Sequence, residues 1–331
     1  MSITFTQALR DTLTAEMKRD PSIFLMGEDI GLYGGAFGVT RGLLETFGPQ
    51  RVRDTPISEQ ALTGIAIGAA VAGQRPVIEF MFMDFITLAV DQIVNMAAKL
   101  KPIYGMDCPL VIRAPHGGGR GYGATHSQSL ERLFMGIPGI LIAAPSNAAD
   151  ASALLQTALR GKSPVLFLEH KMLYPQRFDD IDPLPEPIPF GVANVVRTGK
   201  DVTLISWSYM TQLAIQASDQ LRSSGIEAEV IDLLTLNPLD MGMIIESLKQ
   251  TGRVMIIEEG PKTGGVGAEI AAQIMEQAYD YLEKPLLRLA SPDLPIPSAK
   301  NLEAACIPSA ESIQKAAREL LSSNQGTVIS D

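Results

Sequence analysis

Cysteine is scarce in this chain of 331 residues, which contains only Cys108 and Cys306. The two lie far apart in the sequence and match no spacing that binds zinc or forms a redox motif. A framework of disulfides, as in small secreted proteins, is excluded for the same reason. We therefore expect a protein of a reducing compartment, most simply the cytoplasm of a bacterium.

Long apolar runs and an excess of basic charge are also absent. No run reaches the length of about 18 residues that crosses a membrane. Residues 1–20 alternate charged and apolar side chains at helical spacing, without the pattern of a signal or transit peptide. The chain has 37 acidic against 27 basic residues, a net charge of −10. We expect neither a nucleic acid nor a membrane as its partner.

Short apolar runs instead alternate with stretches of helical periodicity, which is typical of a parallel sheet with helices on both faces. The predicted strands are residues 23–26, 77–80, 110–113, 139–143, 165–169, 202–207, 228–233, 253–258 and 285–289. The predicted helices are residues 5–18, 61–72, 88–100, 147–159, 210–222, 241–248, 266–282 and 309–321.

The length of the chain predicts about two domains, since a typical domain has about 150 residues. Residues 174–189 contain five prolines and little helical period, which indicates an extended linker. The sequence therefore predicts an α/β protein of two domains. We place the domains at residues 1–175 and 199–325, the linker at 176–198 and a tail at 326–331.

Glu59 stands at the start of a predicted helix that is small and apolar on every face. Such a pattern predicts a helix that is buried all round. The carboxylate either complements the dipole at the helix N-terminus or exchanges a proton with a ligand at the edge of a dry interface. Spacing alone does not decide between these two interpretations.

Two further segments have similar ambiguity. Glu28 follows a predicted strand and precedes a glycine-rich stretch, which fits no dinucleotide or phosphate-binding pattern and indicates a turn. Phe85 follows another predicted strand, a few residues after Met81. An aromatic side chain there belongs either to the core or to a platform on which a planar ring stacks.

His126 is one of only three histidines and follows a predicted strand through a loop with five glycines. Open α/β sheets bind their ligands outside the carboxyl ends of their strands, where this loop begins. The alternative is a solvated histidine on a surface loop. The sequence shows no Ser–His–Asp order and no cluster of metal ligands.

Taken together, these segments resemble a known family. GEDIGLYGGAFGVTRGL, DTPISEQ, EFMFMDF and HSQSLE are similar to the beta subunit of thiamine-diphosphate-dependent 2-oxo acid dehydrogenases. TLISWS, EVIDLLTLNPLD, EEGPKTGGVGAEIA and PDLPIPSAKNLE resemble its transketolase-type C-terminal domain. The resemblance covers residues 3–325 and implies a pyrimidine-binding domain followed by a transketolase-like domain.

The resemblance also implies roles for the candidate residues. Glu59 matches the glutamate that hydrogen-bonds the pyrimidine nitrogen of thiamine diphosphate. Phe85 matches the aromatic side chain that packs on the pyrimidine ring, with Met81 nearby. His126 matches the active-site histidine that serves when the acyl group passes to a lipoyl arm. Glu28 matches an acidic position in a proton relay between paired sites.

Gly-Asp-Gly, which holds Mg²⁺ and the diphosphate in thiamine enzymes, does not occur in this chain. The resemblance therefore implies that an alpha subunit supplies the magnesium site, in a heterotetramer of two alpha and two beta chains. The further partners would be the lipoyl acyltransferase component of the complex and a small 2-oxo acid. The implied activity is oxidative decarboxylation with reductive acylation of a lipoyl domain, which leads to acyl-CoA.

The family often carries a potassium ion bound mostly by backbone carbonyls. The positions matching its ligands are Leu110, Ala158, Leu159, Gly161 and Ser163. Carbonyl ligands do not depend on the side chain, so the sequence neither supports nor excludes this ion. The chain departs from the family at residues 99–108, where it is shorter, which affects the expected acyl-chain preference.

Pyruvate is the expected substrate, and branched-chain 2-oxo acid or acetoin dehydrogenases are the nearest alternatives. A second alternative is the C-terminal half of a split transketolase-like enzyme, which would use an aldehyde acceptor in place of a lipoyl domain. A third is a non-catalytic subunit that only holds an alpha chain in an assembly.

Overall fold

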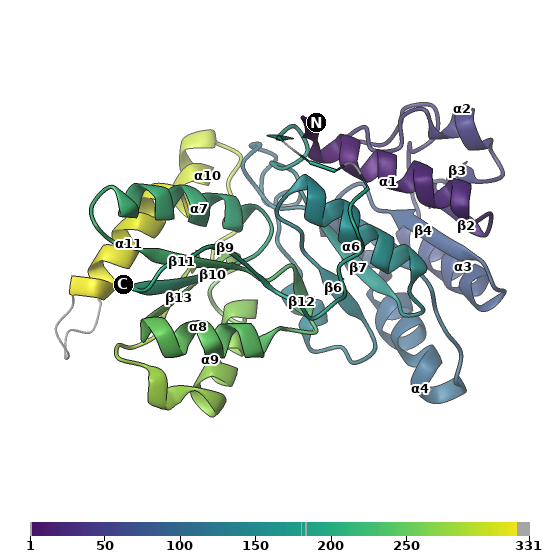
Figure 1. Cartoon of the computed structure of the whole chain (residues 1–331). Coiled ribbons are helices and arrows are strands. Elements are labelled where there is room, and N and C mark those ends of the chain that lie inside the picture. The colour runs from purple at the N-terminus through teal and green to yellow at the C-terminus, as the bar shows by residue number, and fades with distance from the viewer. Residues whose placement is uncertain (1, 180, 183, 323–331) are drawn as a thin grey trace.

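Two α/β lobes lie side by side in the computed structural model, which describes residues 2–179, 181–182 and 184–322 (Figure 1). Each lobe has a mostly parallel sheet between two layers of helices, so the predicted fold class is confirmed. The tail predicted at residues 326–331 lies outside the described residues. Within the described ranges, no helix is long and apolar enough to cross a membrane.

The first lobe is built on a seven-stranded sheet with the order β12-β6-β7-β5-β4-β2-β3. Its strands are β2 (Ile23–Gly27), β3 (Val52–Asp54), β4 (Arg75–Glu79), β5 (Val111–His116), β6 (Leu141–Ala143), β7 (Val165–His170) and β12 (Thr235–Asn237). All neighbours are parallel except β12, which comes from the second half of the chain and pairs antiparallel with β6. β12 thereby covers one edge of the sheet.

Helices cover both faces of this sheet (Figure 1). One face carries α1 (Phe5–Arg19) and α6 (Ala148–Arg160), whose apolar side chains pack in one core with alternate residues of the strands. The opposite face carries α3 (Glu59–Val71), η1 (Met83–Ala89) and α4 (Leu100–Tyr104). α1 and α6 are capped at their N-termini by Thr4 and Asn147, whose side chains accept hydrogen bonds from the first helical turn.

The second lobe has a five-stranded sheet with the order β14-β13-β10-β11-β9, in which only β9 runs antiparallel. Its strands are β9 (Asn194–Arg197), β10 (Val202–Ser206), β11 (Ala228–Asp232), β13 (Val254–Pro261) and β14 (Leu287–Ser291). One face is covered by α7 (Tyr209–Arg222) and α11 (Ala310–Ser322) and the other by α8 (Met241–Thr251) and α9 (Val266–Gln277). Trp207 and Ile231 join the same apolar core as α3, so the two lobes share buried surface.

The helix predicted at residues 88–100 is not one regular helix. The structure has the 3₁₀ helix η1, the π-helix η2 (Gln92–Met96), the 3₁₀ turn η3 (Ala97–Lys99) and then α4. The buried residues Met83, Ile86 and Ala89 are spaced by three, which suits a 3₁₀ helix, whereas Ile93 and Ala97 continue at a spacing of four. The spacing of the buried side chains thus changes where the helix type changes.

Other elements also differ from the sequence-based expectation. The segment expected to be a linker, 176–198, contains β8 (Arg177–Phe178), which pairs with β1 (Ile3–Thr4), and β9. The sequence analysis missed α2 (Leu43–Phe47), α5 (Arg132–Met135), α10 (Lys300–Cys306) and β12. The helix predicted at 266–282 ends at Gln277 and is followed by η4 (Tyr279–Tyr281).

The apolar pattern of α3 predicted a helix buried on every face, and within this chain that prediction is wrong. Leu62 and Ala66 are buried, but Ile65 is 58% exposed and Val71 45% exposed. Part of α3 therefore faces solvent in the isolated chain.

Candidate active site

The candidate residues follow the carboxyl ends of four neighbouring strands of the first sheet. Glu28 follows β2, Glu59 follows β3, Met81 and Phe85 follow β4, and His126 follows β5. These strands are neighbours and parallel, so their carboxyl ends meet at the same edge. The fold therefore collects side chains that are almost a hundred residues apart in sequence.

Glu28 and Glu59 form a pair of buried carboxylates, with 8% and 5% of their surfaces exposed. Burial raises the pKa of Glu28, and the negative charge of Glu59 raises it further. The Oε1 atom of Glu28 is buried and has no hydrogen-bond partner among the described residues. A buried acceptor without a donor is costly, which indicates a position where another molecule supplies a polar group.

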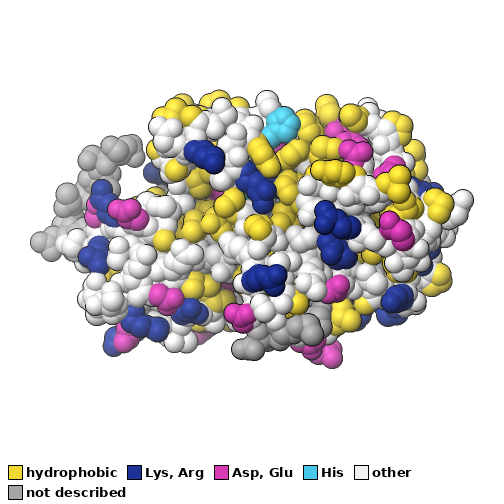
Figure 2. Space-filling model, turned by 90° about the horizontal axis from the view of Figure 1, so that it is seen from above, with side chains coloured by type: hydrophobic (Ala, Val, Ile, Leu, Met, Phe, Trp, Pro, Cys, Tyr) yellow, Lys and Arg dark blue, Asp and Glu magenta, His cyan; other side chains and the backbone are white. Residues whose placement is uncertain are grey.

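An aromatic cluster lies beside His126, which is half-buried. Its ring is edge-on to those of Phe82 and Phe85, with centroids 5.0 and 5.4 Å away. Its Nδ1 atom is 2.9 Å from the hydroxyl of Thr125. Figure 2 shows hydrophobic side chains around a histidine on a face that also carries basic groups. This arrangement offers a planar apolar wall next to a group that transfers protons.

Lys171, the first residue after β7, places a positive charge next to the backbone of His126. Its side chain is buried, and its Nζ atom donates a hydrogen bond to the backbone carbonyl of His126. Nζ also lies 5.1 Å from the ring centroid of Phe82. Burial lowers the pKa of Lys171 to about 8, although the charge of Asp84 opposes that shift. The carbonyl contact fixes the backbone that carries the imidazole.

Asp84 holds the same backbone segment through Gln128. Its buried Oδ1 atom accepts hydrogen bonds from the backbone amide of Gln128, at 3.2 Å, and from the Gln128 side chain, at 2.9 Å. Gln128 lies two residues after His126, so η1 and the histidine segment are joined directly. The motif HSQ thus has a structural role at its third position.

The glycine-rich loop before His126 is held by two carboxylates of the second lobe. Glu303 accepts hydrogen bonds from the amides of Gly119 and Gly121, at 2.9 and 2.8 Å. Glu259 accepts one from the amide of Gly118, at 2.6 Å. A loop with so many glycines is flexible by itself, and these bonds to charged acceptors give it one conformation.

Glu259 also pairs with His170, whose Nε2 atom is 2.6 Å from the carboxylate. Burial alone would raise the pKa of Glu259, but His170 outweighs it and the pKa falls to about 2. Gly117 has a φ of +85°, and a Cβ atom there would lie 2.0 Å from the Nε2 atom of His170. Only glycine therefore allows the loop to pass this hydrogen-bonded pair.

A buried ion network lies in the strands directly below the site. Arg113 on β5 forms an ion pair with Glu79 on β4 and donates two hydrogen bonds of 2.7 Å to Glu169 on β7. The hydroxyl of Tyr174 donates to Glu169 at 2.7 Å. Burial lowers the pKa of Arg113, but Glu169 and Glu79 outweigh it and raise the pKa, so the guanidinium stays charged.

Four of the five backbone carbonyls expected to bind potassium accept hydrogen bonds within the chain. The carbonyl of Leu110 accepts from the amide of Val165 at 2.8 Å, and that of Ala158 from the amide of Gly161 at 3.3 Å. The carbonyls of Leu159 and Gly161 both accept from the Nη1 atom of Arg75.

Sequence reasoning missed Lys171, Asp84, Glu259 and Glu303 as parts of this site. Lys171 was detectable in principle, because it is a charged residue only two positions after the predicted strand at residues 165–169. Glu303 gave no such signal, since it acts on a loop 182 residues earlier in the chain.

Comparison with known proteins identifies relatives over nearly the whole chain. Residues 1–177 match the family described as transketolase, pyrimidine binding domain, and residues 191–313 match the family described as transketolase, C-terminal domain. The chain is 46% identical over 97% of its length to the pyruvate dehydrogenase E1 component subunit beta of Rickettsia bellii, and covers 99% of that protein. It is 42% identical over 96% of its length to the mitochondrial subunit beta-1 of Arabidopsis thaliana, of which it covers 88%.

A solved structure shows the same fold. The chain named split gene transketolase, inactive beta4 tetramer, superposes with a TM-score of 0.80 at 25% identity. The match covers 97% of the present chain and 98% of that chain.

Proposed function

The chain belongs to the family of pyruvate dehydrogenase E1 component beta subunits, and from that membership we propose that it acts as the beta subunit of a thiamine-diphosphate-dependent 2-oxo acid dehydrogenase. The reaction is oxidative decarboxylation of a 2-oxo acid, pyruvate above all, followed by reductive acylation of a lipoyl domain. The observation that carries this proposal is the convergence of Glu59, Phe85 and His126 at one sheet edge.

The residues present fit the pyrimidine half of thiamine diphosphate. Glu59 would hydrogen-bond the ring nitrogen, and Phe85 with Met81 would pack on the ring. The unpartnered Oε1 atom of Glu28 is an acceptor for a donor that this chain does not provide. When bound, the cofactor supplies the carbon nucleophile and the electron sink that loss of carbon dioxide requires. The carboxylate of Glu59 would exchange a proton with the pyrimidine nitrogen.

His126 serves the second half of the reaction. Its Nδ1 atom is engaged by Thr125, which leaves Nε2 as the ring nitrogen that meets an incoming acceptor. We assign to Nε2 the transfer of a proton when the acyl group passes to the lipoyl arm. Lys171 and Asp84 are positioning residues, because both act on the backbone of the segment 126–128.

The alpha subunit completes the site in this proposal. The chain has no Gly-Asp-Gly, and its described residues contain no group of three side chains suited to a metal ion, so the alpha subunit would hold Mg²⁺ and the diphosphate. Ile57 is 81% exposed and Leu32 85% exposed, and both follow the strands that present Glu59 and Glu28. We propose that the alpha chain covers this apolar surface in an assembly of two alpha and two beta chains.

The lipoyl acyltransferase and the cytoplasm remain parts of the same proposal. Cys108 is buried, Cys306 is partly buried, and neither forms a disulfide, which agrees with a reducing compartment. Potassium is not part of the proposal, because four of the five carbonyls matched to it accept hydrogen bonds within the chain, two of them from the cationic side chain of Arg75.

Expressed alone, the chain is expected to bind thiamine diphosphate with Mg²⁺ negligibly, because it provides no diphosphate site. Addition of the alpha subunit should restore binding. Titration calorimetry of the isolated chain, the alpha chain and the mixture measures this. Tight binding by the isolated chain would contradict the shared site, and activity of the mixture on pyruvate, branched 2-oxo acids and acetoin identifies the substrate.

Replacement of His126 by alanine is expected to lower the overall reaction with the lipoyl domain about 100- to 10,000-fold, the usual range for loss of a general acid or base. Decarboxylation measured with an artificial electron acceptor should fall much less, since His126 acts after carbon dioxide has left. His116→Ala, which removes a buried imidazole that contacts His170 and Ser208, is the control for packing effects. Equal losses in the two assays of His126→Ala would refute the division of roles.

A further inference from the structure

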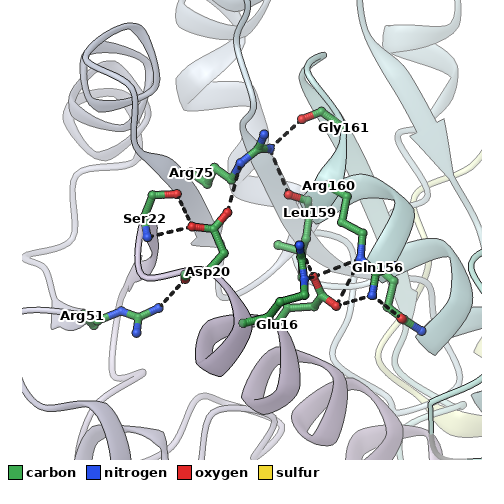
Figure 3. A network of polar contacts seen from close by, with 10 residues as sticks. Glu16, Asp20, Ser22, Arg51, Arg75, Gln156, Leu159, Arg160 and Gly161 are labelled. Atoms are coloured by element: carbon green, nitrogen blue, oxygen red, sulfur yellow. Dashed lines mark hydrogen bonds and ion pairs between the residues drawn. The ribbon is translucent and has the colours of Figure 1, made fainter.

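Arg75 contacts the backbone carbonyls that the family resemblance assigns to a potassium ion. It stands at the first position of β4, and its Nη1 atom donates hydrogen bonds to the carbonyl of Leu159, at 3.0 Å, and to that of Gly161, at 2.7 Å (Figure 3). Both carbonyls belong to the last turn of α6 and to its cap. A single nitrogen therefore bridges two of the five expected ligands.

Two of the other expected ligands are also engaged. The carbonyl of Leu110 is part of the ladder between β5 and β7, through the amide of Val165. The carbonyl of Ala158 accepts the amide of Gly161, which closes the end of α6. Potassium is bound by carbonyl oxygens that replace its water shell, so it needs several of them directed at one point. Here four of the five expected carbonyls accept hydrogen bonds from groups of the chain.

Electrostatics favours one positive charge at this place and opposes two. The carbonyls at the C-terminus of a helix carry partial negative charge, and a cationic side chain there is stabilising. The guanidinium of Arg75 provides that cation permanently, since arginine does not lose its proton in proteins. A potassium ion on the same carbonyls would lie within a few ångströms of Arg75 and would be repelled.

Arg75 is held in this position by the turn after α1. Its Nε atom lies 3.4 Å from the carboxylate of Asp20, and the two side chains are each 24% exposed. Asp20 in turn accepts hydrogen bonds from the amide and hydroxyl of Ser22, at 2.9 and 2.6 Å. The guanidinium thus joins the end of α6, the start of β4 and the turn between α1 and β2.

We propose that the guanidinium of Arg75 takes the place of a bound potassium ion in this chain. The residues present do not fit the ion, and the fold carries its own cation at the C-terminus of α6. The stability of the beta subunit is then independent of potassium.

The wild-type enzyme, assembled with its alpha subunit, provides the direct test. After gel filtration from potassium chloride into choline chloride, elemental analysis should find no stoichiometric potassium. The thermal midpoint should agree between the two salts at equal ionic strength to within about 1 °C, whereas a site 100-fold saturated with potassium would raise it by several degrees. One potassium ion per beta chain, or a midpoint several degrees higher in potassium chloride, would overturn the proposal.

Variants of two arginines separate replacement of the ion from ordinary packing. Arg75→Ala exposes the carbonyls, so its midpoint should fall by several degrees in choline chloride and recover in part in potassium chloride. The matched control is Arg51→Ala, because Arg51 also donates to backbone carbonyls, those of Asp20 and Ile23, which are not among the five. Its midpoint should fall equally in both salts.

The remaining outcomes are also informative. If Arg75→Ala folds but melts equally in both salts, the carbonyls form no cation site and the proposed replacement is refuted. If it does not fold, Arg75→Lys keeps the charge, and its midpoint should stay insensitive to potassium; a rise in potassium chloride would contradict the proposal. These readouts are metal content and unfolding, so their failure would leave the proposed catalytic function intact.

Discussion

Replacement of Glu59 by glutamine is expected to lower the turnover of the assembled enzyme about 100- to 10,000-fold, the range found when a proton-transferring group is lost. Glutamine keeps the shape and the hydrogen-bonding capacity of the side chain. It does not exchange a proton with the pyrimidine nitrogen. Affinity for the cofactor should change far less, because the diphosphate and the ring contacts remain.

The measurement is deuterium exchange at the thiazolium carbon of the bound cofactor, compared between wild type and Glu59→Gln. The matched control is Glu45→Gln, since Glu45 is also a carboxylate in the first turn of a helix but is exposed and lies on α2. If the cofactor of Glu59→Gln exchanges deuterium as fast as that of wild type, Glu59 only complements the helix dipole, which is the other interpretation that the sequence left open.

Replacement of Arg113 by methionine is expected to destabilise the enzyme by about 3–5 kcal/mol, the usual cost of breaking a buried ion pair from one side. The carboxylates of Glu79 and Glu169 would remain in the core without their counter-ion. Urea unfolding of the assembled enzyme, followed by fluorescence, should show a much lower midpoint. The loss should appear even though Arg113 contacts neither the proposed pyrimidine ring nor His126.

Two comparisons test the electrostatic explanation. Arg160→Met removes an arginine whose partner is Glu16 but whose side chain is 38% exposed, so its effect should be within about 1 kcal/mol. Adding Glu79→Gln and Glu169→Gln to Arg113→Met removes the unpaired charges and should recover part of the midpoint. A triple variant no more stable than Arg113→Met would show that packing, and not charge, dominates.

The strands that the sequence predicted well are those buried on both faces. Residues 77–80 and 165–169 are apolar except for Glu79 and Glu169, and the structure places β4 and β7 there, inside the sheet. β9 and β12 are three or four residues long and lie at sheet edges. Their strand conformation comes from pairing with a distant segment, and no local periodicity records that pairing.

The candidate site shows the same division. Glu28 and His126 were selected because each follows a predicted strand, and parallel strands bring their carboxyl ends together. Glu59 was selected because it stands at the start of a predicted apolar helix. Glu303 and Arg75 depend on partners that are distant in sequence, and their importance lies in which backbone groups they meet. The sequence pattern does not indicate contacts with distant backbone groups, so these roles become visible only in the folded structure.

The short strand β12 makes the first lobe depend on the second half of the chain. It is contributed by the second half, yet it pairs with β6 and covers an edge of the first sheet. A fragment that ended in the region between the lobes would expose the unpaired amides and carbonyls of β6, which form a template for strands of other molecules. In the folded chain the second half thus keeps this edge from pairing with other molecules.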